Sequence, residues 1–183
     1  MGWVDALARH CAARTPAVLV TVVSTKGSVP RGPGTRMVVT AGGVDGTIGG
    51  GHLEFSAIDI ARNMLAGNSA PDGELKRFPL GASLGQCCGG LVNLLFEQVD
   101  TNAEWVAMLT SLRRDGVAAV VATPAERAGT GRLIVTAERV TGTLGHEALD
   151  VRVVEASRDL LAEGGGARLA RLGSGDEESG MLV

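Results

Sequence analysis

The chain has 183 residues, 45% of them hydrophobic, which is enough to bury one domain-sized core or two smaller ones. Its 17 Lys and Arg against 20 Asp and Glu give a net charge of −3, which disfavours nucleic acid as a partner because affinity for phosphates depends on basic side chains. Aromatic residues make up only 3% of the chain, so a ligand must be held mainly by backbone groups, charges and sulfur.

Cysteine usage and the N-terminal sequence indicate the cellular compartment. Three cysteines, two of them adjacent at Cys87 and Cys88, do not form the disulfide framework of a small secreted domain. The first residues contain no apolar signal-peptide core, and the longest apolar run, Ala17 to Val23, is too short to cross a bilayer. We therefore expect a soluble, cytoplasmic protein without a membrane span.

The spacing of hydrophobic residues predicts amphipathic helices that alternate with short strands. Helices are expected over residues 3–14, 52–66 and 105–114. Strands are expected over residues 17–24, 36–41, 44–48, 75–80, 91–99, 117–123, 167–172 and 181–183. Between two of these strands, Gly42 and Gly43 predict a tight hairpin turn with positive φ.

The sequence contains one pattern twice. Residues 36–66 and 132–162 align at an offset of 96 positions and are identical at twelve of them, and Trp3 and Trp105 open matching helices. We predict an α/β class of the mixed α+β type, built from two copies of a helix, strand, hairpin, helix and strand-pair unit, with helices packed against mixed sheets. Residues 1–100 form the first copy, and residues 101–183 form a degenerate second copy packed with it as one domain.

Residues shared by both copies are explained by the shared fold, which separates scaffold from candidate site. Glu54, in the first turn of its helix, is matched by Asp150, and an acid at that place interacts favourably with the helix dipole. We therefore interpret Glu54 as structural rather than as a catalytic acid. Arg36, which is matched by Arg132, is interpreted as scaffold for the same reason.

Three segments of the first copy have no counterpart in the second. They read GSVPRGPG at residues 27–34, GTIGGGHLE at residues 46–54 and LGQCCGG at residues 84–90. All three lie at the ends of predicted strands, where loops converge. We infer a single site, built by the first copy.

Gly49, Gly50 and Gly51 stand directly before a predicted helix. Their N–H groups can cradle a phosphate at the positive end of the helix dipole. The spacing matches neither the dinucleotide fingerprint nor a Walker loop, and a tight turn that needs positive φ explains the glycines equally well. Arg31, between Pro30 and Gly32, can clamp the same anion with its planar guanidinium, the alternative being a solvated surface arginine.

Glycines flank Cys87 and Cys88, which places the two thiols in a loop. A thiolate there can bind a soft metal or carry sulfur, and because neighbours in extended backbone point to opposite sides, we expect one thiol to face a ligand while the other packs. A structural zinc site lacks its usual spacing, and no base is identifiable for a cysteine hydrolase. Cys11 is interpreted as structural, and His52 as either a ligand or an ordinary first-turn residue.

The combination of GSVPRGPGTRM, DGTIGGGHLE and LGQCCGG resembles the XdhC/CoxI family, accessory proteins of xanthine dehydrogenase and related molybdenum hydroxylases. The resemblance covers about residues 19–96. It implies a molybdenum cofactor chaperone that binds molybdopterin, protects it while a cysteine desulfurase helps to install the terminal sulfido ligand, and delivers it to the apo-hydroxylase. Family members often carry a downstream Rossmann-like domain, which we expect to be absent from this chain.

This resemblance and the residues together assign a site. The candidate cofactor-binding residues are Ser28, Arg31, Gly49, Gly50, Gly51, Gln86, Cys87 and Cys88; the glycines and Arg31 take the phosphate, Ser28 a pterin or phosphate hydrogen bond, and Cys87 or Cys88 the metal or its sulfur. No catalytic residue is assigned. Two alternatives stay open: a thiol-dependent sulfur-transfer enzyme acting on the cofactor, and a cofactor-free module that docks the hydroxylase. A homodimer is also left open.

Overall fold

The computed structural model describes residues 2–68, 73–80, 89–125, 131–167, 169–171 and 180–182. The first copy contains α1 (Trp3–Ala12), β1 (Ala17–Lys26), β2 (Arg36–Val39), β3 (Val44–Gly46), α2 (Gly51–Leu65), β4 (Glu74–Pro79) and β5 (Leu91–Val99). The second contains α3 (Glu104–Arg114), β6 (Val120–Pro124), β7 (Arg132–Val135), β8 (Val140–Thr143), α4 (Glu147–Ala162), β9 (Leu169–Arg171) and β10 (Gly180–Leu182). None of the helices in these described ranges is long and apolar enough to cross a membrane.

Each copy builds a five-stranded sheet, and the strand orders β3-β2-β1-β5-β4 and β8-β7-β6-β10-β9 are equivalent. The predicted α+β class and the duplicated unit are therefore confirmed. The expectation of mixed sheets is wrong, because every described strand pair is antiparallel. The helix α2 joins β3 to β4, which run in the same direction but lie at opposite edges of their sheet, so this connection creates no parallel neighbours.

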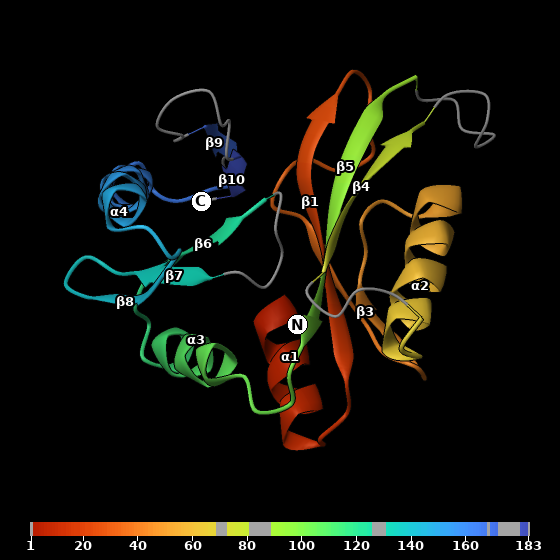
Figure 1. Cartoon of the computed structure of the whole chain (residues 1–183), viewed down its shortest axis with the longest axis horizontal. Helices are drawn as coiled ribbons and strands as arrows, with labels where there is room; N and C mark the ends of the chain where they lie inside the picture. The colour runs from red at the N-terminus through yellow and green to blue at the C-terminus, as the bar shows by residue number, and fades with distance from the viewer. Residues whose placement is uncertain are drawn as a thin grey trace.

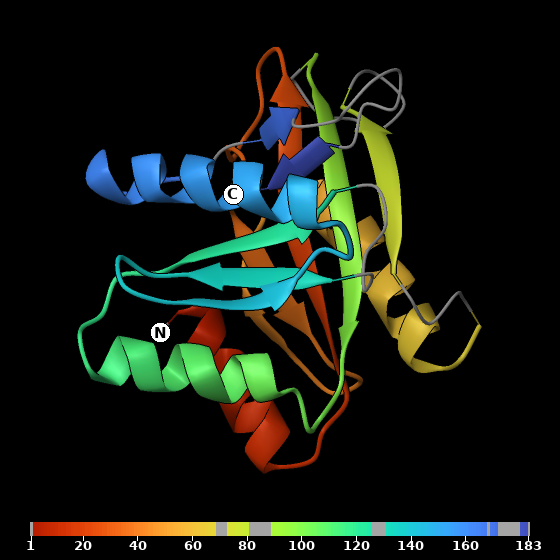
Figure 2. The same cartoon turned by 60° about the vertical axis from the view of Figure 1, so that its left-hand side comes forward.

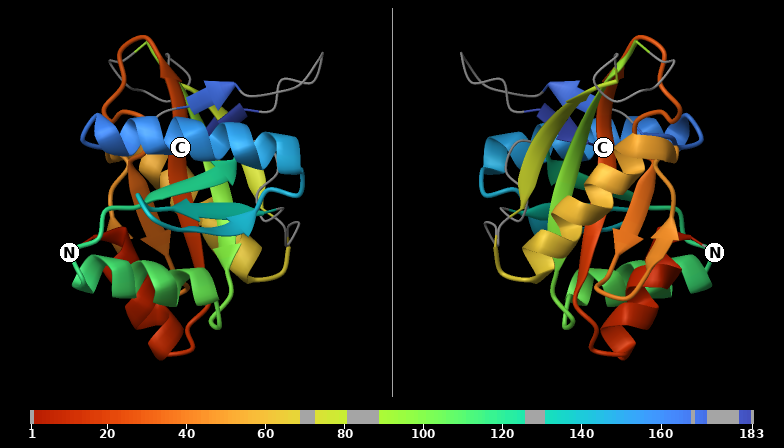
Figure 3. Two further views of the ribbon diagram at one scale, coloured as in Figure 1. Left: turned by 90° about the vertical axis from the view of Figure 1, so that its left-hand side faces the viewer. Right: turned by 90° about the vertical axis from the view of Figure 1, so that its right-hand side faces the viewer.

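The sheets and helices form layers (Figure 1). Helix α2 covers the outer face of the first sheet and α4 covers that of the second, on opposite sides of the molecule (Figure 3). Helices α1 and α3 pack against each other, and β6 and β7 run across the direction of β1 and β5 (Figure 2). The inner faces of the two sheets therefore meet where the copies join.

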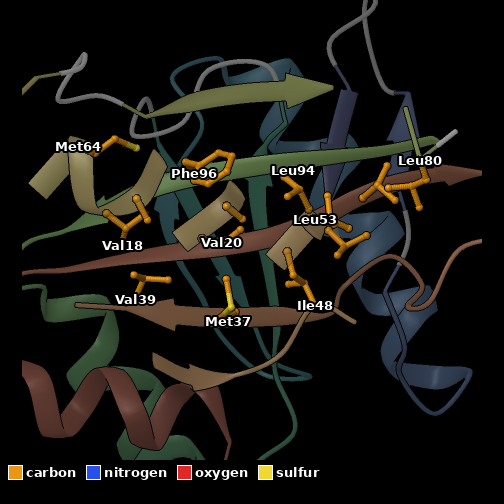
Figure 4. Close-up of a cluster of buried hydrophobic side chains, with 14 residues drawn as sticks. Val18, Val20, Met37, Val39, Ile48, Leu53, Met64, Leu80, Leu94 and Phe96 are labelled. Atoms are coloured by element: carbon orange, nitrogen blue, oxygen red, sulfur yellow. The ribbon is translucent and has the colours of Figure 1, made fainter. Parts of the chain in front are cut away.

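Alternation along β1 divides the core between the two faces of the first sheet. Val18 and Val20 belong to the large cluster under α2, whereas Leu19 belongs to the cluster under α1. The first cluster also contains Leu53 from α2 and Phe96 from β5, and both side chains are fully buried (Figure 4). This packing holds α2 against the face of the sheet formed by β1 and β5.

The hairpin between β2 and β3 turns in a different way from the prediction, because neither Gly42 nor Gly43 has a positive φ. The Thr40 hydroxyl accepts a hydrogen bond from the Gly43 N–H at 3.0 Å, and the Thr40 N–H donates to the Gly43 carbonyl at 2.9 Å. Thr136 and Arg139 close the second hairpin with the same pair of bonds. A threonine side chain thus fixes the turn, and glycine is not required for it.

A stack of two tryptophans and two arginines lies where the copies meet. The ring centroids of Trp3 on α1 and Trp105 on α3 are 6.3 Å apart. The guanidinium of Arg36 lies 4.6 Å from the Trp3 centroid, and that of Arg132 lies 3.9 Å from the Trp105 centroid. Such cation–π contacts contribute about 0.5–2 kcal/mol each, depending on desolvation. The location of both arginines agrees with their interpretation as scaffold.

Glu97 on β5 also belongs to this interface and pairs with only one of the arginines. Its Oε1 accepts a hydrogen bond of 2.7 Å from Nη2 of Arg132, and 7% of the Glu97 side chain is exposed. Burial raises the pKa of the Glu97 carboxyl and lowers the pKa of the Arg132 guanidinium, and the attraction between the two groups opposes both shifts. Burial also lowers the pKa of Arg36 to about 10, which leaves it charged at neutral pH.

We predict that Arg132→Met lowers the free energy of unfolding by about 3–5 kcal/mol, because it leaves the Glu97 carboxyl buried without its partner. The double variant Arg132→Met, Glu97→Met should recover much of this loss. Arg114→Met, which breaks the exposed pair of Arg114 with Asp115, should cost less than about 1 kcal/mol. Urea titration measures all three, and an Arg132→Met effect as small as that of Arg114→Met would contradict the prediction.

Candidate functional site

The loop of residues 27–34 lies between the other two segments that distinguish the first copy. Pro30 packs so closely on Gly49 that a Cβ added to Gly49 would lie 2.5 Å from the Pro30 Cγ. A Cβ added to Gly90 would overlap the carbonyl oxygen of Ser28. The structure therefore brings the first two segments together and seats the described end of the third against the same loop.

The pairing of β1 with β5 explains why these loops meet. The two strands pair as far as Lys26 and Leu91. The loop of residues 27–34 therefore begins, and the segment of residues 84–90 ends, at the same end of the sheet. Directly beyond that pair, Gly27 has a φ of +75°, and a Cβ there would lie 3.3 Å from the Gly90 Cα. Glycine is needed at this crossing both for its backbone conformation and for the close approach of the two chains.

Three successive residues in the left-handed region precede and open α2. Gly49, Gly50 and Gly51 have φ values of +124°, +75° and +67°. At the three matching positions of the second copy, only Gly145 has a positive φ, and the next residue, His146, has a φ of −138°. Of the two interpretations left open for these glycines, the turn that needs positive φ is confirmed.

The Glu54 carboxylate organises this turn. Its Oε2 accepts hydrogen bonds of 3.0 Å from the N–H groups of both Ile48 and Gly50, and another from the Thr47 hydroxyl. In the second copy, Asp150 accepts equivalent bonds from the Leu144 N–H and the Thr143 hydroxyl. The structural interpretation of Glu54 is therefore confirmed.

These bonds determine which amides of the glycine turn are free. The Gly50 N–H donates to Glu54, and the Gly49 N–H donates to the Thr47 hydroxyl at 3.1 Å. Gly51 is the first residue of α2, so its N–H has no acceptor within the helix. An anion at this turn would meet the amides of the first helical turn rather than those of Gly49 and Gly50.

The polar side chains nearest to this turn are exposed. Arg31 lies beside Gly49, since a Cβ there would be 3.5 Å from the Arg31 Cγ. Both Arg31 and Ser28 are solvent-accessible, as is His52 in the first turn of α2. A guanidinium, a hydroxyl and the N-terminal end of a helix are thus presented around one loop, a set of groups that suits an anionic ligand.

The sulfur-bearing part of the predicted site is outside the described residues. Gln86, Cys87 and Cys88 all fall in that portion of the chain, and Gly89 is the first described residue after them. In the described part of the chain, no group of three or more His, Cys, Asp or Glu residues lies close enough to hold a metal ion. Cys11 contacts the Asp100 carbonyl at 3.7 Å, and burial raises the pKa of its thiol, which agrees with its structural interpretation.

The first two motifs fall within a match to a known family, because the model of the XdhC and CoxI family matches residues 10–78. The resemblance inferred from the motifs is therefore confirmed. The match ends before the LGQCCGG motif, so the third motif rests on the sequence resemblance alone.

The fold is similar to that of a solved protein. A crystal structure from Bacillus halodurans, described as a xanthine dehydrogenase, superposes with a TM-score of 0.68 at 19% sequence identity. The superposition covers 83% of this chain and 48% of that chain, so the chain spans about half the length of the structure that it matches. At this identity the likeness shows the fold. No curated protein matches the chain.

Sequence analysis missed two features of the described surface and interior. The contact of Glu97 with Arg132 is absent from the sequence predictions. The available signal was that each copy has a tryptophan and an arginine at matching positions, which indicates a shared structural role for these residues. Phe55 was not singled out either, yet 64% of it is exposed on the first turns of α2. Its counterpart Val151 is 54% exposed, so a surface apolar residue belongs to both copies.

We predict that Gly49→Ala destabilises the protein more than Gly145→Ala does. Both glycines have positive φ, but only Gly49 has Pro30 against it, whereas a Cβ on Gly145 meets nothing within 4 Å. The shared conformational cost is about 1 kcal/mol, and the overlap with Pro30 adds at least about 1 kcal/mol. Thermal unfolding measures the difference, and equal melting temperatures would show that the loop does not rest on Gly49.

Glu54→Ala is expected to free the Ile48 and Gly50 amides and to lower the free energy of unfolding by about 1–3 kcal/mol. Hydrogen exchange at these two amides should accelerate. Asp150→Ala is the matched control, because it removes the equivalent bonds from the second copy and should leave exchange at Ile48 and Gly50 unchanged. Unaltered exchange in Glu54→Ala would mean that the carboxylate does not hold the turn.

Proposed function

We propose that this protein is a maturation factor for molybdenum hydroxylases. It binds the molybdenum cofactor at the first-copy loops, which are the segments of residues 27–34, 46–54 and 84–90. The match of residues 10–78 to the XdhC and CoxI family model supports the maturation role. The observation that carries the proposal is the seating of the loop of residues 27–34 against Gly49 on one side and Gly90 on the other. Segments far apart in the sequence thereby present their polar groups around one loop.

The described residues fit the phosphate end of molybdopterin. When bound, the cofactor supplies a phosphate, polar pterin edges and a molybdenum centre. The phosphate would lie at the start of α2, where the Gly51 N–H has no intrahelical acceptor and where the helix dipole favours a negative charge. Arg31, exposed and adjacent to Gly49, would donate to the same oxygens.

Gly49 and Gly50 then serve the site indirectly. Because their N–H groups donate to Thr47 and Glu54, their role is to hold the left-handed turn that presents the start of α2. The second copy keeps the acid of this turn but has His146 and Glu147 in place of the second and third glycine. We therefore assign phosphate binding to the first copy alone.

The metal end would be served by Cys87 or Cys88. Both cysteines directly precede Gly89 and Gly90 in the sequence, and Gly90 is seated against the loop of Ser28. A thiolate of this loop would bind the molybdenum centre, as soft sulfur ligands do. Ser28 and Gln86 would supply hydrogen bonds to the pterin.

Binding energy explains why several contacts are needed. A contact at a helix end contributes about 0.3–2 kcal/mol, whereas retention at micromolar affinity needs about −8 kcal/mol. The helix start, Arg31 and one thiol must therefore act together. Such a carrier would receive the sulfido ligand with the help of a cysteine desulfurase in the cytoplasm and pass the cofactor to an apo-hydroxylase.

We predict that Arg31→Ala weakens the binding of molybdenum cofactor by about tenfold, the effect of losing one hydrogen bond to a charged group. Arg62→Ala is the matched control, because Arg62 is an exposed arginine in the last turn of the same helix, about 16 Å along the axis from Gly51. Anaerobic titration with the isolated cofactor should leave the Arg62→Ala affinity unchanged.

Cys87→Ser and Cys88→Ser separate the two thiols in the same titration. We expect one of them to weaken binding by at least about tenfold and the other to have little effect, because neighbouring side chains point to opposite sides wherever the backbone is extended. Wild-type affinity in Arg31→Ala and in both cysteine variants would contradict the proposal. Normal binding of the hydroxylase without any cofactor binding would favour a docking module instead.

A further inference from the structure

A small cavity lies at the junction of the two copies, apart from the first-copy loops. Its volume is about 10 Å³, and its polar lining comes from Arg36, Arg132, Glu97, Thr21 and Thr123. The two tryptophan rings of the interface complete the wall. The cavity shares no residue with the proposed cofactor site.

The lining is nearly symmetric between the copies. Thr21 pairs with Arg36 in neighbouring strands of the first sheet, and the register of β6 with β7 places Thr123 opposite Arg132 in the second. Each copy thus contributes a threonine, an arginine and a tryptophan. Glu97 is the one acidic residue of the lining, so two guanidinium groups face one carboxyl and at least one positive charge has no counter-ion.

Several donors of the lining have no acceptor. The Thr21 hydroxyl is buried, with 1% of the residue exposed, and makes no hydrogen bond. The Nε of Arg132 is also buried and unpaired, although its Nη2 is bonded to Glu97. The Arg36 guanidinium of the lining stacks on the Trp3 ring. A buried donor without an acceptor costs about 1–3 kcal/mol, so these groups together call for one shared acceptor.

We propose that this cavity binds a small monovalent inorganic anion, of the size of chloride, which accepts hydrogen bonds from Thr21 and Arg132 and balances the charge of Arg36. The volume suits one water-sized sphere or a monatomic ion and excludes a phosphate ester or a larger carboxylate. A water molecule would satisfy the donors but would leave the excess positive charge without a counter-ion.

The anion would bridge the two copies. It would contact Thr21 from the first copy and Arg132 from the second, so bound halide should stabilise the packing of the two sheets. Any species that binds only the folded protein raises its stability as its concentration increases. This effect is independent of the molybdenum cofactor, because the groups involved lie outside the first-copy loops.

The test uses the intrinsic fluorescence of the full chain. Trp3 and Trp105 are its only two tryptophans, and both line the cavity, so the whole tryptophan signal reports on this place. Bromide quenches indole fluorescence on contact. With ionic strength held constant by gluconate, which is too large to enter, we expect a saturable quenching phase at millimolar bromide that chloride reverses by competition.

Substitutions of residues that line the cavity test whether the saturable quenching arises from bromide bound there. Arg36→Met should raise the dissociation constant of the halide by at least about tenfold, and Thr21→Val should raise it several-fold. Each substitution removes a hydrogen-bond donor to a charged group. Arg62→Met, on the exposed side of α2, is the control and should leave it unchanged. Thr21→Val keeps the shape of the side chain, so it carries the comparison if Arg36→Met does not fold.

Quenching that rises linearly with bromide, without saturation and without reversal by chloride, would overturn the proposal, because it reports collisions alone. A saturable phase that is the same in wild type, Arg36→Met and Thr21→Val would overturn it too. The melting temperature gives a second readout: chloride in place of gluconate should raise it in the wild type but not in Thr21→Val, and an equal rise in both would contradict the assignment.

Discussion

The close approach of the loop of residues 27–34 to Gly49 and Gly90 is the constraint on which the candidate site depends. Because no Cβ fits at either glycine, the backbone of two distant segments can touch the same loop. The Glu54 carboxylate adds the second requirement, since it holds the turn that leads from the glycines into α2. The proposed binding role follows from this geometry rather than from any single side chain.

Duplication explains how one fold supports both a scaffold and a site. The acid that braces the turn before the long helix occurs in both copies, as Glu54 and Asp150, and so do the threonine-closed hairpins and the Trp–Arg stacks at the junction. Only the first copy has three left-handed glycines at the start of the helix that follows this turn. The shared features therefore maintain the sheets and their contact, while the first copy carries the loops that we propose to bind the ligand.

Sequence reasoning succeeded where local pattern decides the outcome. The order of helices and strands, the duplication and the structural role of Glu54 followed from periodicity and from the comparison of the copies. The Gly42–Gly43 turn was predicted wrongly, because a hydrogen bond to the Thr40 hydroxyl closes the turn without a positive φ at glycine. The strand directions were predicted wrongly, because α2 connects two strands at opposite edges of the sheet rather than two neighbours. The buried pair of Glu97 with Arg132 joins strands of different sheets, a contact that no local spacing reveals.

The cofactor content of the protein in its cellular setting decides between a carrier and a docking module. The chain should be isolated without oxygen from cells that produce the molybdenum cofactor, and its molybdenum and pterin should be quantified per chain. We predict the two in near-equal amounts, and their loss together in Arg31→Ala. A protein that carries neither molybdenum nor pterin, although hydroxylases in the same cells contain their cofactor, would contradict the proposed carrier function.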